Sequence, residues 1–332
     1  MELSVFFAGT GGSLPTQRRG LPGLLVRRGG DTLLVDCGEG TQRQLLRSIG
    51  LTDIDEVLIT HLHADHWLGL PGMLKTFDMR DRTRPLAIHG PRGLEDLIAN
   101  LMRYAGATSY ELHVVELGDG EILERDGYEI EAVAVSHRGP ALGYVLHEHD
   151  RPGVFDPERA RQAGLRDGPD FGRVQRGETV AGVTPEMVMG PARAGRKLTV
   201  SGDTRPSAAL AEAAHGSDLL VHEATFAIED AERAHQTGHS TATQAAGVAR
   251  DAEVVMLALN HISIRYPASV IRDQAREIFA NTVVPRDFDT IEIPFPERGA
   301  PRLLRWSERD SAAAGPLAGS SGQAGTAADR RS

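Results

Sequence analysis

The order of hydrophobic and polar positions predicts strands and helices that alternate along most of the chain. Short apolar runs bounded by Gly, Pro or Asp predict strands, and apolar residues recurring every three to four positions predict helices. In residues 41–49, for example, Leu45, Leu46 and Ile49 share one helical face and Gly50 ends the pattern. Strands and helices mixed in both halves indicate layers of helix on sheet, an α/β protein. The predicted strands are 3–8, 24–27, 32–36, 57–60, 86–89, 113–116, 128–136, 141–147, 197–201, 218–222 and 253–259, and the predicted helices are 41–49, 93–104, 207–214, 241–249 and 269–280.

Two segments break this rhythm. Residues 150–196 are rich in Gly, Pro and Arg, show little periodicity and are too long for an ordinary connection. Residues 307–332 are rich in Ala, Gly and Ser and hold no aromatic residue, which predicts a disordered C-terminal tail. We therefore divide the chain into a folded domain over residues 1–306, with 150–196 inserted in it, and a tail.

Composition is that of an ordinary globular protein. The chain has 332 residues, of which 40% are hydrophobic and 25% charged, and can bury a full core without disulfides. The single cysteine, Cys37, predicts a reducing, cytoplasmic location, and neither a signal peptide nor a membrane span is predicted. Taken alone, the formal charge of −10 argues against nucleic acid as a partner. The charge balance of residues 150–196 differs from that of the whole chain. This segment has more basic than acidic residues, and all of its basic residues are Arg.

The strongest chemical signal is the run HLHADH at residues 61–66, which directly follows a predicted strand. His61 and His63 are two apart in extended chain, so their side chains point to the same side. Asp65 and His66 follow where the chain should turn, and they can face a neighbouring point in space. Four metal-capable side chains in six residues suit two adjacent metal ions, and imidazole with carboxylate donors favours zinc over manganese or iron. A histidine-rich surface loop is the alternative, but it does not explain why strand, turn and ligand order agree.

Three more residues of suitable chemistry each follow a predicted strand. His137 follows strand 128–136, Asp203 lies in Ser-Gly-Asp-Thr, and His261 lies in Asn-His-Ile-Ser. A single histidine at a strand end is usually structural, but strand ends are also where a layered α/β protein gathers its site. Three such positions together predict the remaining ligands of a two-metal site.

At this point the sequence resembles the tRNase Z (ribonuclease Z) family of the metallo-β-lactamase superfamily. The HxHxDH run with later His, Asp and His is typical of the superfamily, whose fold is an αββα sandwich with a two-metal site at its rim. The closer resemblance to tRNase Z covers roughly residues 1–295. It is carried by GTGGSLPT at 9–16, VDCGEGTQ at 35–42, SHR at 136–138 with LGY at 142–144, GDTR at 202–205, HEATF at 222–226 and GHST at 238–241.

The resemblance implies an endoribonuclease that removes the 3′ trailer from precursor tRNA, leaving a 3′-OH on the tRNA and a 5′-phosphate on the trailer. It implies two Zn²⁺ per subunit, with Mn²⁺ able to replace them. The ligands it implies are His61, His63 and His137 for one ion, Asp65, His66 and His261 for the other, and Asp203 between them.

The resemblance also implies roles in proton transfer. Asp65 accepts a proton and orients the attacking water, in addition to its equally good role as a ligand. His239 donates a proton to the departing 3′ oxygen, and Glu223 holds the tautomer of His239. His222 is either a support for this group or a structural histidine.

For substrate binding, the resemblance assigns residues 150–196 to a protruding arm that grips the tRNA far from the cut. It further implies a homodimer in which the arm of one subunit serves the active site of the other. Candidate phosphate contacts are Arg159, Arg161, Arg166, Arg173 and Arg176 in the arm, with Arg18, Arg19, Arg27 and Arg28 near the rim of the site.

Two alternatives remain open from the sequence. A small-molecule or cyclic-nucleotide phosphodiesterase of the same fold would use the same metal ligands but would not need a basic arm. A metal-stabilised RNA-binding module would bind precursor tRNA without cutting it.

Overall fold

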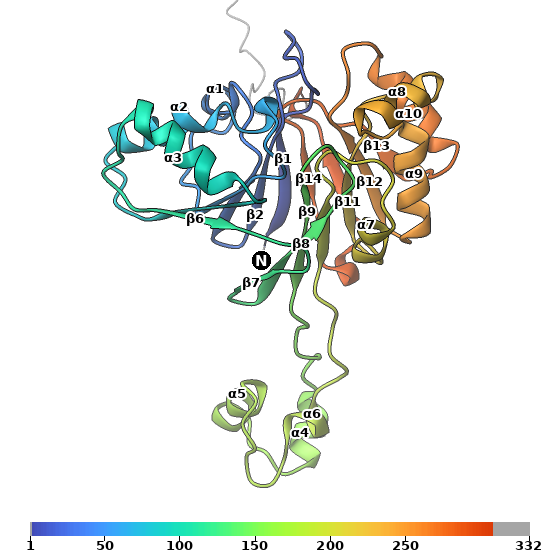
Figure 1. Ribbon diagram of the computed structural model, residues 1–332. Coiled ribbons are helices and arrows are strands. Elements are labelled where there is room, and N and C mark those ends of the chain that lie inside the picture. The colour runs from blue at the N-terminus through green and yellow to red at the C-terminus, as the bar shows by residue number, and fades with distance from the viewer. Residues whose placement is uncertain (1, 308–332) are drawn as a thin grey trace, which may run out of the picture.

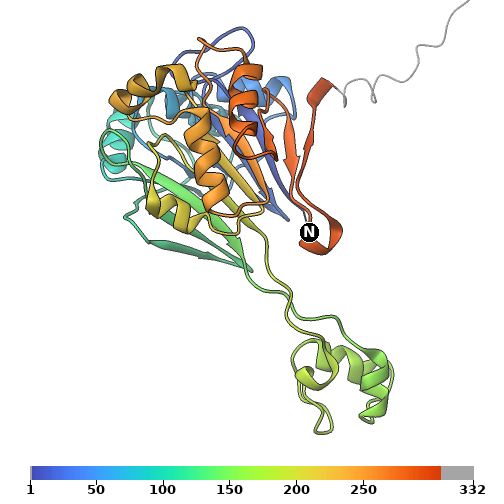
Figure 2. The same cartoon turned by 90° about the vertical axis from the view of Figure 1, so that its right-hand side faces the viewer.

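Two mixed β-sheets face each other in the computed structural model, which describes residues 2–307, and helices cover both outer faces (Figures 1 and 2). The αββα sandwich expected from the sequence is confirmed. The first sheet contains, in spatial order, β15 (Arg302–Leu304), β14 (Thr290–Glu292), β1 (Leu3–Gly9), β2 (Gly23–Arg28), β3 (Asp31–Val35), β4 (Glu56–Leu58), β5 (Leu86–Gly90) and β6 (Leu112–Glu116). The second contains β13 (Thr282–Val283), β12 (Met256–Asn260), β11 (Leu219–Glu223), β10 (Lys197–Val200), β9 (Leu142–Glu148), β8 (Tyr128–Ala134) and β7 (Ile122–Arg125).

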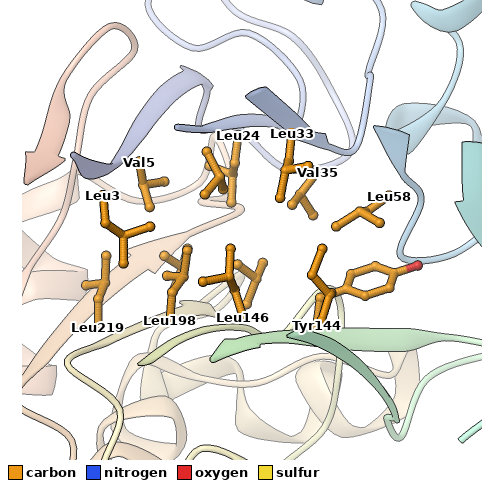
Figure 3. Close-up of a cluster of buried hydrophobic side chains, with 14 of the residues drawn as sticks. Leu3, Val5, Leu24, Leu33, Val35, Leu58, Tyr144, Leu146, Leu198 and Leu219 are labelled. Carbon is orange, nitrogen blue, oxygen red and sulfur yellow. The ribbon is translucent and has the colours of Figure 1, made fainter. Parts of the chain in front are cut away.

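The strands have apolar residues on both faces because each sheet is covered twice. In β1, Leu3, Val5 and Phe7 pack between the two sheets, whereas Phe6 and Ala8 pack under the helices. Figure 3 shows the layer between the sheets, where Leu3 and Val5 from one sheet oppose Leu198 and Leu219 from the other. Burying each such Leu or Val contributes roughly 1.5–3 kcal/mol relative to leaving it exposed.

Two helical layers complete the sandwich. The layer over the first sheet consists of α1 (Thr41–Arg47), α2 (Leu70–Met79) and α3 (Leu94–Ala105), and the layer over the second consists of α7 (Ala208–Ala213), α8 (Ala231–Thr237), α9 (Ala242–Asp251) and α10 (Ala268–Arg276). The start of α9 carries a capping box, in which Thr241 accepts from the backbone of Gln244 and Gln244 accepts from the backbone of Thr241. No helix within residues 2–307 is both long and apolar enough to cross a bilayer.

An arm protrudes from the sandwich between β9 and β10 (Figure 1). It consists of a stalk, made of one outgoing and one returning segment of the chain, and three short helices, α4 (Pro157–Gln162), α5 (Pro169–Gln175) and α6 (Pro185–Val188). A small core of its own, with Ala160, Leu165 and Val174 at its centre, holds the helices together. Residues 150–196 therefore hold regular structure, although their sequence shows little periodicity.

Most predicted elements lie within a few residues of observed ones, but the ten-residue helix α2, which buries Leu70, Met73, Leu74 and Phe77, was not predicted. The unpredicted strands are β7, β13, β14 and β15, and the unpredicted helices outside the arm are α2 and α8. The tail predicted for residues 307–332 lies, from residue 308 onward, outside the described residues.

The strand directions define two ends of the sandwich, which we call the site edge and the base edge. Because β3 and β4 are parallel, and β8, β10, β11 and β12 also share one direction, all six strands end at the site edge. The antiparallel strand β9 starts at the site edge and ends at the base edge, where the arm begins. Its seven residues place the two edges about 20 Å apart.

Candidate metal centre

All seven predicted ligands meet at the site edge, where the two sheets are joined. His61 forms a β-bridge with Ala141, and the Leu142 N–H donates to the Thr60 carbonyl at 2.8 Å. These contacts bring the run after β4 against the start of β9, although β4 and β9 belong to different sheets. The remaining ligands arrive on the parallel strands of the second sheet, since His137, Asp203 and His261 follow β8, β10 and β12.

His61, His63 and His137 form the first ligand group. Nδ1 of His63 lies 3.0 Å from Nε2 of His61 and 3.1 Å from Nε2 of His137. Burial, followed by the neighbouring His66, lowers the pKa of His61 well below its usual value, so its lone pair is available. Ligand nitrogens about 2.1 Å from a tetrahedral ion lie about 3.4 Å apart, close to the spacing observed here. The three converging nitrogens therefore fit one divalent ion.

Asp65, His66 and His261 form the second group. Oδ2 of Asp65 lies 3.4 Å from Nε2 of His261 and 3.7 Å from Nε2 of His66. Nε2 of His66 is buried without a hydrogen-bond partner among the described residues. A buried nitrogen without a partner is costly, and a metal ion in front of it would satisfy its lone pair. This group therefore also fits a divalent ion.

Asp203 lies between the two groups. Its Oδ2 is 3.6 Å from Nε2 of His61 in the first group, and 3.4 Å and 3.3 Å from Nε2 of His66 and His261 in the second. Burial raises the pKa of Asp203, but the imidazoles of His261 and His66 outweigh burial and lower it well below its usual value. The carboxylate is therefore charged and within reach of both candidate ions.

Glu223 and His239 form a pair beside these ligands. Oε1 of Glu223 lies 2.8 Å from Nδ1 of His239. The carboxylate of Glu223 also accepts from the Thr204 N–H, the Thr225 N–H and the Thr225 hydroxyl, at 2.7–3.0 Å. Burial lowers the pKa of His239, but the Glu223 carboxylate outweighs it and raises the pKa to about 9. Because Nδ1 faces Glu223, the proton that His239 can give to another molecule is on Nε2.

Asp36, which sequence reasoning left without a role, supports the second group. Its Oδ2 accepts from Nδ1 of His66 at 2.7 Å, and its Oδ1 accepts from the Thr60 N–H at 2.8 Å. A carboxylate behind a metal-binding histidine fixes the tautomer and the ring orientation. The signal in the sequence was an Asp at the end of a buried strand.

The end of α8 supports the first group and His239 together. The Gly238 carbonyl accepts from Nδ1 of His137 at 2.7 Å, and Gly238 has a φ of 88°, which favours glycine. Arg138 and Arg205 donate to the Gln236 and His235 carbonyls in the last turn of α8, at 2.6 Å and 2.9 Å. Two cations at a helix C-terminus are favourable, and here they fix the turn that leads into His239.

His222 lies outside the ligand groups. It is buried, and its Nδ1 lies 2.7 Å from the Glu223 carbonyl. The structure therefore favours the structural reading of this histidine.

Three of the predicted substrate contacts are corrected by the structure. Arg27 and Arg28 end β2 at the base edge and therefore do not lie near the rim of the site, and Arg28 is buried there in a pair with Glu148. Arg19 donates to the Thr10 hydroxyl and the Pro285 carbonyl, so it supports its own loop. That loop reaches the site, because the Ser13 N–H donates to Oδ2 of Asp65 at 2.9 Å.

The arm is nearly neutral. Residues 150–196 hold eight arginines and seven acidic residues. Each predicted phosphate contact has an acidic partner within the arm, and these pairs are Arg159–Asp156, Arg161–Asp167, Arg166–Asp170, Arg173–Glu178 and Arg176–Glu178. Phosphates binding to these arginines would have to compete with the partners already present.

The fold and the site together define a metallo-β-lactamase-fold protein with a divalent-metal centre. The metallo-beta-lactamase superfamily matches residues 23–261. Among curated proteins, the chain is 45% identical to a ribonuclease Z from Halorubrum lacusprofundi over 90% of this chain and 99% of that protein. It is 46% identical to a ribonuclease Z from Haloarcula marismortui over 86% of this chain and 94% of that protein.

Solved structures agree with these relatives. Human tRNase Z, short form, matches with a TM-score of 0.64 and 27% identity, over 88% of this chain and 99% of the human one. The chain therefore belongs to the ribonuclease Z family. The predictions of the family, the fold and an enzymatic function are confirmed.

Proposed function

We propose that the protein is a zinc-dependent endoribonuclease that removes the 3′ trailer from precursor tRNA, leaving a 3′-OH on the tRNA and a 5′-phosphate on the trailer. The observation that carries this proposal is the position of Asp203 between two ligand groups, with His239 beside it at 3.8 Å. Two adjacent ion positions suit a phosphodiester, whose attacking and leaving oxygens both need stabilisation. Membership in the ribonuclease Z family supports RNA as the substrate.

Zinc is the metal that the donor set favours. The proposed ligands provide imidazole nitrogen and carboxylate oxygen without thiolate, and three or four donors surround each position. His61, His63 and His137 would hold one ion, Asp65, His66 and His261 would hold the other, and Asp203 is within reach of both groups. When bound, two such ions supply an activated water at neutral pH and neutralise charge on the scissile phosphate.

Proton movements are assigned to residues on either side of this centre. Two of the proposed ligands are carboxylates, and Asp65 is the less buried of them. Its side chain is 17% exposed, whereas that of Asp203 is 4% exposed. It is therefore the better placed of the two to accept a proton from the attacking water. His239 donates from Nε2 to the departing 3′ oxygen, while Glu223 keeps Nδ1 occupied.

The position of the arm supports a homodimer. The stalk leaves the sandwich at the base edge, whereas the proposed chemistry takes place at the site edge, about 20 Å away. We propose that the arm of one subunit holds the precursor while its 3′ end enters the site of the other. A single, fully buried cysteine supports action in the cytoplasm.

The test is cleavage of a precursor tRNA labelled at its 3′ end by the purified protein. The expected result is release of the intact trailer with a 5′-phosphate, loss of release after chelation, and recovery when zinc is returned. A protein that binds the precursor but releases no trailer with metal present would contradict the proposal and favour an RNA-binding module. Cleavage of small phosphodiesters alone would instead favour a small-molecule phosphodiesterase.

A further inference from the structure

The root of the arm is a narrow connection between two bodies that have separate cores. The outgoing and returning chains of the stalk are joined by isolated bridges, Arg151 with Arg193 and Phe155 with Met189. The backbones lie so close that a side chain at Gly153 would collide with the Gly190 carbonyl. The core of the arm holds residues of the arm alone. The stalk by itself would therefore leave the direction of the arm weakly determined.

A buried charge cluster fixes the points where the stalk joins the body. Glu148, the last residue of β9, accepts from Arg28 at 3.1 Å and from two nitrogens of Arg196 at 2.7 Å and 2.8 Å. Arg196 directly precedes β10 and donates to the Ile293 carbonyl at 2.8 Å. The cluster ties the first and last residues of the stalk to each other and to the chain that follows β14.

The chain after β14 then contacts the stalk itself. The ring of Phe295 lies between two guanidinium groups, with Cζ of Arg151 3.5 Å and Cζ of Arg196 4.0 Å from the ring centroid. Arg151 belongs to the outgoing chain and Arg196 to the returning chain, so one ring contacts both. Contacts between guanidinium groups and aromatic faces are favourable, and more so when partly removed from water.

Glu297 adds a second contact from the same segment. Its two carboxylate oxygens accept from the two terminal nitrogens of Arg151 at 2.8 Å and 2.9 Å, and Oε1 also accepts from Arg193 at 3.3 Å. A bidentate pair of this kind restricts orientation as well as distance. The hydrogen bond from Arg151 lowers the pKa of Glu297 to about 2, so the carboxylate is charged at neutral pH.

We propose that Phe295 and Glu297 form a clip that fixes the direction in which the arm leaves the body, and that they are thereby positioning residues for precursor tRNA. The proposal rests on the proposed function, because it assumes that the arm holds the substrate. A freely pivoting arm would lose orientational freedom on binding RNA, whereas a clipped arm has already lost it. The clip lies far from the site edge and therefore acts on substrate binding and not on bond cleavage.

The first experiment measures the direction of the arm without RNA. Spin labels are attached at Glu186→Cys in α6 and Asp251→Cys at the end of α9, with Cys37 left in place because it is buried. The labelled protein is mixed with an excess of unlabelled protein, so that each homodimer holds at most one labelled subunit and only distances within a subunit are measured. We expect a narrow distance distribution in the parent protein and a broad one in Phe295→Leu/Glu297→Gln. An unchanged distribution in that double variant would overturn the proposal.

The second experiment separates positioning from chemistry. We expect the double variant to raise KM for precursor tRNA about tenfold, with kcat within twofold of the parent and hydrolysis of bis(p-nitrophenyl) phosphate unaltered. The single variant Phe295→Tyr keeps a ring between the two arginines. It should show the same narrow distance distribution and the same KM as the parent protein. A broad distribution with an unaltered KM would refute the positioning role.

Glu292→Gln is the matched control. Glu292 pairs with Arg302 at 2.6–2.8 Å on the neighbouring β14–β15 hairpin, and within residues 2–307 its side chain forms no ion pair with the stalk. This variant should behave as the parent protein in both experiments, and a broadened distribution in it would overturn the assignment to Phe295 and Glu297. If the parent protein cleaves no precursor tRNA, the proposed function fails, while the distance distributions still decide whether the clip fixes the arm.

Discussion

The two edges of the sandwich arrange buried charges in opposite ways. At the base edge, Glu148 accepts hydrogen bonds from two arginines, and Glu56 at the start of β4 pairs with Arg125 from the other sheet. At the site edge, imidazole nitrogens face one another, and Nε2 of His66 has no hydrogen-bond partner among residues 2–307. The buried carboxylates of the base edge are neutralised by arginines, whereas the site edge gathers imidazoles and carboxylates with no arginine among the seven ligands. This contrast distinguishes a structural charge cluster from a site prepared for a ligand.

The largest effect should come from removing the shared ligand. Asp203→Asn is expected to lower kcat/KM for precursor tRNA and for a small phosphodiester by more than about a thousandfold, because several kcal/mol of charge stabilisation depend on it. Metal content and both activities are measured on the same preparation. The Arg28→Met variant, which is changed at the base edge, should retain bound metal. If this variant also loses metal, the proposed difference between the two edges is wrong.

Removing the arm should affect only one substrate. Residues 154–189 are replaced by Asn-Gly, which can join the two chains of the stalk as a tight turn and leaves Arg151, Arg193 and Arg196 in place. We expect kcat/KM for precursor tRNA to fall by about a hundredfold or more, because the proposed binding surface of the arm is removed. Hydrolysis of bis(p-nitrophenyl) phosphate should be unaltered. Retained cleavage of precursor tRNA would show that the arm is not the binding element.

A smaller effect is expected at the helix end that supports the site. Arg205→Met removes the hydrogen bond to the last turn of α8 and should lower kcat about tenfold for both substrates, as loss of outer support typically does. If Arg205 instead contacts RNA, KM for the precursor will rise and the small substrate will be unaffected. Arg233→Met, on the exposed side of the same helix, is the matched control.

The last prediction concerns stability at the base edge and leaves activity aside. Burial raises the pKa of Glu56, but His89 and Arg125 outweigh it and lower the pKa to about 2. The folded state therefore binds fewer protons than the unfolded state, and the contribution of Glu56 is complete above about pH 4.5 and is lost as the pH falls toward 2. Glu56→Gln should lower the free energy of unfolding by about 2–3 kcal/mol at pH 6, and the difference should shrink by pH 3. A difference that is constant across urea titrations from pH 6 to pH 3 would contradict the assignment.

Local patterns were sufficient wherever a signal is carried by neighbours in sequence. The HLHADH run follows β4 as expected, and His137, Asp203 and His261 each follow their strands. Their meeting could be anticipated because strands of one direction end at one edge of a sheet. The three arm helices carried a local signal that was missed, since each begins with a proline at its first position. With only four to seven residues each, they are too short to show a helical period.

The sequence by itself therefore determined the layered fold, the order of the strands along the chain and the candidate ligands, because these depend on the period of apolar residues and on short motifs. Only the tertiary structure decided which charge meets which partner. Arg28 pairs with Glu148, 120 residues away, at the base edge. Phe295 contacts Arg151 from the segment that follows β14, a strand held in place by its pairing with β1. The residues next to a charged or aromatic side chain in the sequence do not reveal which distant residue it contacts. Its role is therefore set by the packing that brings distant segments together.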